Sequence, residues 1–303
     1  MLRDSAPDRY HPVASGFRHD AFVYTDEEDF VRQSATYVHE GLDAGETVVA
    51  VLPEDRNSLL RKALDGVADQ VIFLDMGEVG RNPARLIPLW RRLLDQVPPD
   101  LPIRGLGEPA YVGRSPAELE ETALHEHLLG VAFTEYAGRF QLRCPYSAEL
   151  AVDPAELHST GPQRGADLSF RCPLPAVPAE AEQQEFGMGD LNAVRRRVNV
   201  AARSLQLTDD RIDDLELALH EICTNSVRFG GGRGTLSWWA ADGQLVCDVA
   251  DHGRIDDLLI GRVLPPVDGP GGRGVWLANQ LCDLVQVRSG ADGTQVRLHT
   301  RAR

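Results

Sequence analysis

The sequence predicts two domains: an N-terminal α/β domain with a parallel sheet and a C-terminal α+β sandwich. The chain has 303 residues, which is about the length of two domains. Strand-like and helix-like segments alternate over residues 19–146, as in a parallel sheet that helices cover on both faces. From about residue 188 the order becomes two helices, two strands, a loop, a helix and two strands. This second order favours helices on one face of a mixed or antiparallel sheet.

In the N-terminal half, short apolar runs mark the strands and longer amphipathic stretches mark the helices. A segment over 153–185 contains five prolines and predicts a loosely packed linker. The expected division is an N-terminal tail over 1–15, a domain over 16–150, a proline-rich linker over 151–187 and a second domain over 188–303. The expected strands are 19–24, 46–52, 69–75, 102–108 and 139–144, and the expected helices are about 26–42, 54–65, 83–96 and 115–136.

In the C-terminal half, the first helix is expected over about 189–205, where apolar residues recur at helical spacing. Thr208, followed by two aspartates, has the chemistry of an N-cap for the second helix. Ala-Asp-Gly turns between neighbouring strands favour antiparallel pairing. The expected strands are 235–240, 244–251, 284–289 and 294–300.

Composition disfavours several classes of function. The formal net charge is −15, so the chain gains nothing from the counterion release that drives nucleic-acid binding, and direct DNA or RNA binding is disfavoured. The sequence has no run of about 18 apolar residues, so no membrane span is expected. The first residues lack the apolar core of a signal peptide. Five scattered cysteines without Cys-x-x-Cys spacing predict buried, reduced thiols in a cytoplasmic protein.

The stretch 217–230 carries the first candidate site. Glu221 and Asn225 are four residues apart on an amphipathic helix pattern, so both side chains point to the same side. A carboxylate can take a proton from an attacking hydroxyl, and a carboxamide oxygen suits Mg²⁺. The alternative interpretation is a solvated helix face.

Two further motifs follow in order. Asp251-His252-Gly253 ends a predicted strand, leaving an acceptor beside backbone that a flat ring can approach closely. Gly271-Gly272-Arg273-Gly274 opens a predicted helix and offers N–H groups and a positive dipole end to phosphate. Each motif alone is also typical of an ordinary turn.

The order of these motifs over residues 186–301 resembles the GHKL (Bergerat-fold) ATPases, and the wording Glu-Ile-Cys-Thr-Asn-Ser is most similar to the anti-sigma-factor serine kinases. The resemblance implies a site for ATP and Mg²⁺, with the segment Arg254–Pro270 as a lid. It implies these roles: Asn225 as metal ligand, Glu221 as the group that positions or deprotonates the nucleophile, Asp251 and Gly253 for adenine, Gly272, Arg273 and Gly274 for phosphate, and Thr294 for the adenine edge through water.

The resemblance also implies partners. Members of this family bind a sigma factor and phosphorylate a serine or threonine of an anti-sigma-factor antagonist, which would make this chain a serine/threonine-protein kinase in transcription regulation. Two alternatives stay open: a non-catalytic ATP-binding module that acts by sequestration, and a histidine kinase lacking its usual dimerisation domain. His125 is interpreted as a surface histidine rather than a phosphoacceptor.

The N-terminal half resembles the MEDS sensory domains, which implies a RecA-like fold over 16–150. The resemblance rests on the stretch 41–46, Gly107-Glu108, Glu126 and Cys144-Pro145-Tyr146. No Gly-x-x-x-x-Gly-Lys-Ser/Thr loop occurs, so no nucleotide hydrolysis is expected here. We hypothesise that Glu108, Glu126 and Tyr146 converge on a pocket for a small molecule, the alternative being a cap and a solvated residue. Homodimerisation stays open.

Overall fold

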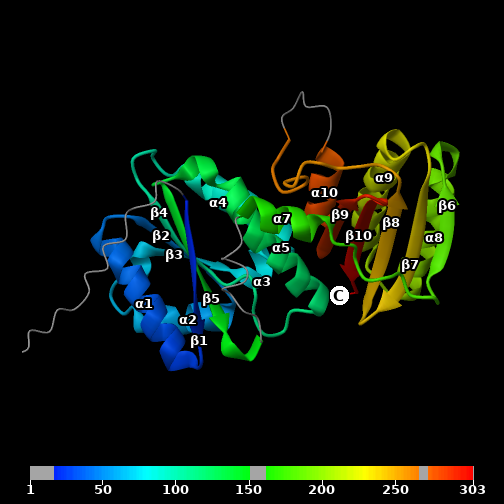
Figure 1. Cartoon of the computed structure of the whole chain (residues 1–303). Helices are drawn as coiled ribbons and strands as arrows, with labels where there is room; N and C mark the ends of the chain where they lie inside the picture. The colour runs from blue at the N-terminus through cyan, green and yellow to red at the C-terminus, as the bar shows by residue number, and fades with distance from the viewer. Residues whose placement is uncertain (1–16, 151–161, 266–271, 303) are drawn as a thin grey trace, which may run out of the picture.

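Two five-stranded sheets, each with its own helices, lie side by side (Figure 1). The computed structural model describes residues 17–150, 162–265 and 272–302, so the predicted tail, the first part of the predicted linker and the end of the predicted lid lie outside them. The N-terminal sheet is parallel, with strand order β1-β5-β4-β2-β3. The C-terminal sheet is antiparallel, with order β6-β7-β8-β10-β9. The predicted fold class is confirmed.

Helices cover both faces of the N-terminal sheet. Successive side chains of a strand point to opposite faces, so a strand of consecutive apolar residues needs cover on both. Val48 and Ala50 of β2 pack with α1 and α2, whereas Val49 and Val51 face the core that holds α4 and α5. Both faces of β2 are therefore apolar, as in a buried parallel strand. The elements are β1 Arg18–Tyr24, α1 Glu27–Asp43, β2 Thr47–Leu52, α2 Glu54–Ala63, β3 Val71–Asp75, α3 Met76–Val79, α4 Leu86–Gln96, β4 Ile103–Gly107, α5 Pro116–Ala132 and β5 Phe140–Ser147.

The C-terminal sheet buries one face under α8, α9 and α10. The β7–β8 turn uses Asp242 and Gly243, both with positive φ, which matches the twist of a hairpin. The elements are α8 Leu191–Ser204, α9 Asp209–Phe229, β7 Gly234–Ala241, β8 Gln244–Asp251, α10 Arg273–Leu281, β9 Leu284–Gly290 and β10 Gly293–Arg301.

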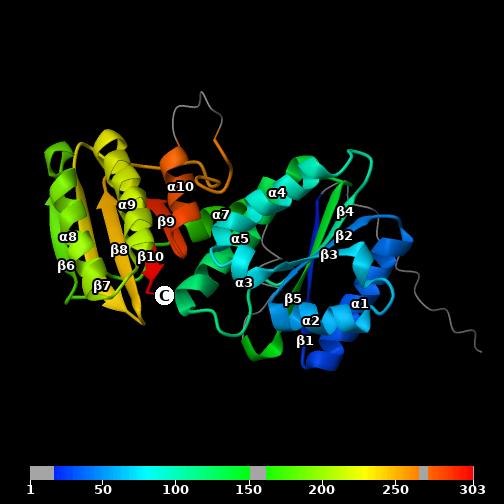
Figure 2. The ribbon, with the colours of Figure 1, turned by 180° about the vertical axis from the view of Figure 1, so that it is seen from behind.

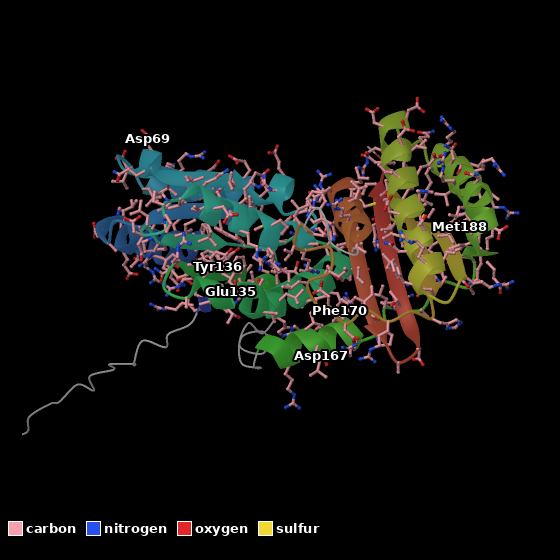
Figure 3. The ribbon with its side chains drawn as sticks, turned by 90° about the horizontal axis from the view of Figure 1, so that it is seen from above. Asp69, Glu135, Tyr136, Asp167, Phe170 and Met188 are labelled. Atoms are coloured by element: carbon pink, nitrogen blue, oxygen red, sulfur yellow. The ribbon has the colours of Figure 1, made fainter. Side chains whose placement is uncertain are left out.

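The predicted linker contains two elements that the sequence pattern did not predict. Helix α7, Pro162–Arg171, lies alongside both domains and contacts α5 and β9, as Figures 2 and 3 show. A proline is tolerated in the first turn of a helix, and Ala166 and Phe170, four residues apart, are buried. Strand β6, Glu182–Phe186, is a polar edge strand with one buried side chain, so it lacks the apolar alternation that marks a strand.

Smaller differences concern single residues. Thr208 occupies the N-cap position of α9, but its side chain makes no capping hydrogen bond. Cys172 is exposed, whereas the other four cysteines are buried, and all five are free thiols. None of the described helices combines the length and the apolar character that crossing a membrane requires.

The outer face of β9 and β10 is polar, and the N-terminal domain covers it. Gln286 and Arg288 alternate with the apolar Val285 and Val287 and point to the opposite face. There the carboxylate of Glu121, from α5, accepts hydrogen bonds from Arg288 (2.9 Å) and Arg262. All three charged side chains are buried, with at most 4% of any residue exposed. The domains are therefore joined through desolvated charge pairs rather than through a wet surface.

A second set of polar contacts holds the C-terminal end of α10. The Arg85 guanidinium donates to the backbone carbonyls of Asn279 (2.7 Å), Gln280 (2.5 Å) and Cys282 (3.1 Å). A cation at this end satisfies carbonyls that have no partner within the helix and complements the helix dipole. Asn82 donates to the side-chain oxygen of Asn279 at 2.9 Å, and Asn279 donates to the Gly261 carbonyl at 3.0 Å.

Candidate functional site

A cavity of about 420 Å³ opens between α9, the segment after β8, the start of α10 and strand β10. Its volume lies within the range of roughly 300–1,000 Å³ that is common for small-molecule sites. Its walls include five of the residues predicted for the nucleotide site: Asn225, Asp251, Gly253, Gly272 and Thr294. The structure thus brings together residues that are up to 69 positions apart in the sequence, from Asn225 to Thr294.

Helix α9 positions Glu221 and Asn225 because it buries its other side. Leu215, Leu219 and Ile222 are buried against the sheet, which leaves the two polar residues one turn apart on the side towards α10. Gly274, in the first turn of α10, lies against both of them. A Cβ at Gly274 would come within 2.8 Å of the Asn225 amide nitrogen and 3.0 Å of Glu221 Oε2. A side chain at this position would displace the Asn225 amide or the Glu221 carboxylate, so the glycine lets both stay where they are.

Asp251 is the last residue of β8, and its carboxylate is fixed by the turn that follows. Its Oδ1 accepts a hydrogen bond from the backbone N–H of Gly253 at 2.7 Å. A Cβ at Gly253 would lie 2.8 Å from the Phe229 carbonyl oxygen, so this turn packs directly on the end of α9. The carboxylate is therefore oriented before any ligand binds.

Thr294 ties β10 to the same turn. It faces Asp251 in the antiparallel register of β8 and β10. Its hydroxyl donates to the Gly253 carbonyl at 2.9 Å and lies 2.8 Å from the Ser289 hydroxyl. Thr294 is buried, so its direct role is to hold the Asp251–Gly253 turn in place.

The start of α10 borders the cavity. Gly272 is the N-cap, with φ of 91°, a left-handed conformation that favours glycine. The backbone N–H groups of the first turn of this helix have no partners within it. Arg273 is exposed and is not among the described residues that line the cavity, so of the three phosphate candidates only Gly272 lines it and Gly274 packs against its wall.

Sequence reasoning missed part of the cavity wall. A Cβ at Gly230 would overlap the Asp251 carboxylate, so this glycine is needed for the close approach of α9 and β8. Its position directly after the last helical residue was a detectable signal, since glycine is common there. The apolar walls gave no such signal, because their residues read as ordinary core: Ile222, Ile255, Ile260, Val275 and Val296.

The three candidate residues of the N-terminal domain divide into two clusters. The Tyr24 hydroxyl donates to Glu108 at 2.6 Å, and burial raises the pKa of Glu108 to about 8. Glu126 instead lies beside Cys144 and Tyr146, and burial together with this carboxylate raises the pKa of the Tyr146 hydroxyl. The alternative interpretation, a cap and a solvated residue, is wrong, since Glu108 and Glu126 are both at most 2% exposed.

The interpretation of His125 as a surface histidine is also wrong. The residue is 1% exposed, and burial lowers its pKa to about 3. It is therefore a neutral, inaccessible imidazole at neutral pH. The alternation of polar and apolar residues along α5 hid this, because α5 is covered by a sheet on one side and by the other domain on the other.

Comparisons with known proteins agree with both halves of the chain. Residues 187–300 match the family model of the histidine kinase-like ATPase domain, and residues 18–159 match that of the MEDS domain, described as the methanogen/methylotroph, DcmR sensory domain. The serine-protein kinase RsbW of Halalkalibacterium halodurans is 32% identical over 124 residues, which cover 37% of this chain and 72% of the relative. Both resemblances inferred from the sequence are confirmed.

A solved structure of the RsbU and RsbW domains of a Mycobacterium tuberculosis protein is also similar, with 16% identity and a TM-score of 0.30. The match covers 48% of this chain and 44% of that chain, so this chain spans less than half of the length of the solved relative.

Replacing Glu108 by glutamine is expected to remove a pH dependence of stability. Burial raises the pKa of Glu108 from 4.5 to about 8, so between these values the folded state holds a proton that the unfolded state has lost. The stability that this proton contributes is full below pH 4.5 and is lost as the pH rises through about 8. We expect the difference in unfolding free energy, wild type minus Glu108→Gln, to fall over this window by up to about 1.4 kcal/mol per pH unit.

Urea denaturation followed by circular dichroism between pH 5 and pH 9 measures this difference. Glu135→Gln is the control, because Glu135 is exposed on the surface (Figure 3) and its replacement should give the wild-type pH profile. A Glu108→Gln profile parallel to that of the wild type would mean that Glu108 is ionised in the folded protein.

Proposed function

Because this chain belongs to the anti-sigma-factor serine kinase type of the GHKL ATPases and carries an N-terminal MEDS domain, we propose that it is an ATP-dependent serine/threonine-protein kinase in the cytoplasm. In this proposal it binds a sigma factor and phosphorylates an anti-sigma-factor antagonist, and thereby regulates transcription. The observation that carries the proposal is the cavity in which Asn225, Asp251 and Gly253 meet the start of α10, with Glu221 and Gly274 at its edge.

The cavity fits an adenine nucleotide in shape and chemistry. Its apolar walls suit a flat ring, and the fixed Asp251 carboxylate offers an acceptor to an exocyclic amino group. The glycine at 274 leaves space beside Asn225 and Glu221 that any side chain would fill. The positive end of α10 favours phosphate. These four features support ATP as the ligand.

Asn225 would hold Mg²⁺ through its amide oxygen, since oxygen ligands suit this ion. When bound, the ion neutralises charge on the γ-phosphoryl group that is transferred and on the ADP that leaves. The residues of this chain would position the nucleotide and the acceptor hydroxyl. Asp251 and Gly253 orient the ring, the first turn of α10 holds phosphate, and Glu221 orients or deprotonates the acceptor hydroxyl of the partner protein.

The competing functions predict different products. A histidine kinase needs an accessible acceptor histidine, and the candidate His125 is buried and neutral. A sequestration module would bind ATP without transferring phosphate. Incubation of the full chain with labelled ATP and with candidate antagonist proteins separates these cases, since acid-stable label on a partner serine or threonine is expected only of the proposed kinase.

Asp251→Asn is expected to weaken ATP binding. Oδ1 of Asp251 is engaged by the Gly253 N–H, so the variant places an amide donor where the adenine amino group needs an acceptor. Loss of a charge-assisted hydrogen bond costs about 1.5–3 kcal/mol, or roughly 10- to 150-fold in Kd. Titration calorimetry measures it, and Asp242→Asn in the exposed β7–β8 turn is the control. Equal ATP affinity for both variants would remove Asp251 from the site.

Glu221→Gln is expected to separate binding from transfer. The substitution keeps the shape of the side chain but removes its basicity, so ATP affinity should stay close to that of the wild type while phosphoryl transfer slows by about 10²–10⁴-fold. Glu216→Gln is the matched control, because Glu216 lies on the same helix and contacts Asn199 and Arg195 instead of the cavity. Transfer at the wild-type rate by Glu221→Gln would assign Glu221 to the solvated helix face.

Sensory control by the N-terminal domain is part of the proposal, and the interface supports a direct route for it. Ile255 and Ile260, which line the cavity, belong to the segment that also carries Arg262, the buried partner of Glu121. Arg85 and Asn82 hold the far end of α10, whose first turn borders the cavity. Two walls of the proposed nucleotide site are thus attached to the N-terminal domain by polar contacts.

Glu121→Gln should therefore lower stability and change nucleotide affinity together. Removing the carboxylate charge leaves the buried Arg262 guanidinium without Glu121 as its anion and Arg288 with Glu120 alone, which costs about 3–5 kcal/mol. We expect the Kd for ATP to rise about 5-fold or more, as in a typical coupling between sites, because the loosened wall must be ordered on binding. Glu120→Gln is the control, since the Glu120 side chain is 37% exposed and bonds Arg288 at 3.3 Å. A stability loss without any change in Kd would make this interface purely structural.

A further inference from the structure

A second chemical centre lies in the N-terminal domain, where α5 packs on β1 and β5. His19 of β1, Glu126 of α5 and Cys144 of β5 bring one imidazole, one carboxylate and one thiol together, with all ligand atoms within 4.8 Å of one another. The alternation along the adjacent parallel strands places His19 and Cys144 on the same face of the sheet, under α5. Glu126 and Cys144 are buried, and the His19 side chain is 12% exposed.

The distances within this cluster are close to those around one tetrahedral metal ion. His19 Nε2 lies 3.0 Å from Glu126 Oε2 and 3.3 Å from Cys144 Sγ, and Cys144 Sγ lies 3.8 Å from Glu126 Oε1. Zinc bonds of about 2.3 Å to sulfur and about 2.0–2.1 Å to nitrogen and oxygen, at tetrahedral angles, separate ligand atoms by roughly 3.3–3.6 Å. The two distances to Glu126 involve different oxygens of its carboxylate, so one oxygen must turn towards both partners before an ion is held, and the three ligand atoms already lie within 4.8 Å of one another.

We propose that His19, Glu126 and Cys144 form a binding site for a divalent cation of the zinc class. A thiolate and an imidazole select late first-row metals such as Zn²⁺ or Co²⁺ over Mg²⁺ and Ca²⁺, which prefer oxygen ligands. Three protein ligands leave a fourth position for water or a small ligand, as in zinc sites that do more than hold a fold together. The partial exposure of His19 gives that position access from solvent.

The three groups already contact one another without an ion. His19 Nε2 lies within ion-pair distance of Glu126 Oε2, and the Cys144 thiol donates a weak hydrogen bond to Glu126 Oε1. A bound dication would replace both contacts, since it attracts the carboxylate, the imidazole and the sulfur together and displaces the thiol proton to solvent as the metal–sulfur bond forms.

The position of Glu126 links this site to the proposed function. Glu126 lies five residues after Glu121 on the same helix, so a cation that pulls on Glu126 acts on the element that holds Arg262 and Arg288. The cation would be the sensory input of the MEDS domain, and this last step rests on the proposed kinase function. Cation binding itself does not depend on that function and is tested without nucleotide.

The test uses the full chain without a polyhistidine tag, stripped with chelator and titrated with Co²⁺. We expect one equivalent of cobalt per chain, measured by elemental analysis, and a thiolate-to-cobalt charge-transfer absorption that Zn²⁺ displaces. Cys144→Ser should abolish the absorption, and Glu126→Gln should lower cobalt affinity by about 100-fold or more, since even partners outside the coordination sphere contribute about 10–100-fold.

Two controls match these variants. Cys172→Ser removes the exposed cysteine, and His39→Ala removes an exposed histidine, and both should bind cobalt like the wild type. Circular dichroism checks that each variant is folded. If Cys144→Ser does not fold, Glu126→Gln, which keeps the side-chain shape, tests the site in its place. Three results would overturn the proposal. The wild type could lack the absorption, folded Cys144→Ser could keep it, or Glu126→Gln could bind cobalt with undiminished affinity. Cobalt binding without any kinase activity would leave the metal site standing and refute the proposed function.

Discussion

The Glu121 carboxylate, buried between the guanidinium groups of Arg262 and Arg288, is the interaction on which the arrangement of the two domains depends. Desolvated charges are costly unless they are paired, and here each guanidinium comes from the C-terminal domain while its partner comes from the N-terminal one. Separating the domains by a few ångströms would leave three buried charges without compensation. The interface therefore specifies one relative placement more strongly than apolar packing of the same area would.

A different constraint shapes the candidate nucleotide site, namely close approach of backbone to side chains. Gly230 and Gly253 let the end of α9 touch the turn that holds Asp251, and Gly274 lets α10 touch Glu221 and Asn225. A methyl group would clash with a backbone oxygen at Gly230 and Gly253, and at Gly274 it would displace the Asn225 or Glu221 side chain. The carboxylate, carboxamide and helix terminus are consequently held in place by packed main chain, which is the kind of support that keeps a binding site preorganised.

Sequence alone could predict most of the fold, for reasons visible in particular segments. QLVCDVAD is bounded by turns and was expected at 244–251, where β8 lies. β6 could not be predicted, because a polar edge strand with only Phe186 buried has no alternation. The site motifs were predictable where the local spacing determines geometry, as for Glu221 and Asn225. The cavity walls and the partners of Glu121 depend on which distant elements meet, and the sequence does not show this. From the sequence alone, a buried acidic residue on a helix cannot be distinguished from a solvated one.

Helix α5 joins these features, and its buried ion pairs resist partial separation of the two domains. Glu118 and Glu121 reach Arg301 and Arg262 in the other domain, whereas Glu126 lies about 7.5 Å further along the axis and faces β1 and β5. A ligand of the N-terminal domain controls the other domain only if it favours one arrangement of this helix over another. Intermediate arrangements would expose neither the Glu121 carboxylate nor its partners to water and would leave them unpaired. The interface is thus stable when fully formed or fully hydrated, and a partly separated interface, with desolvated and unpaired charges, is strongly disfavoured.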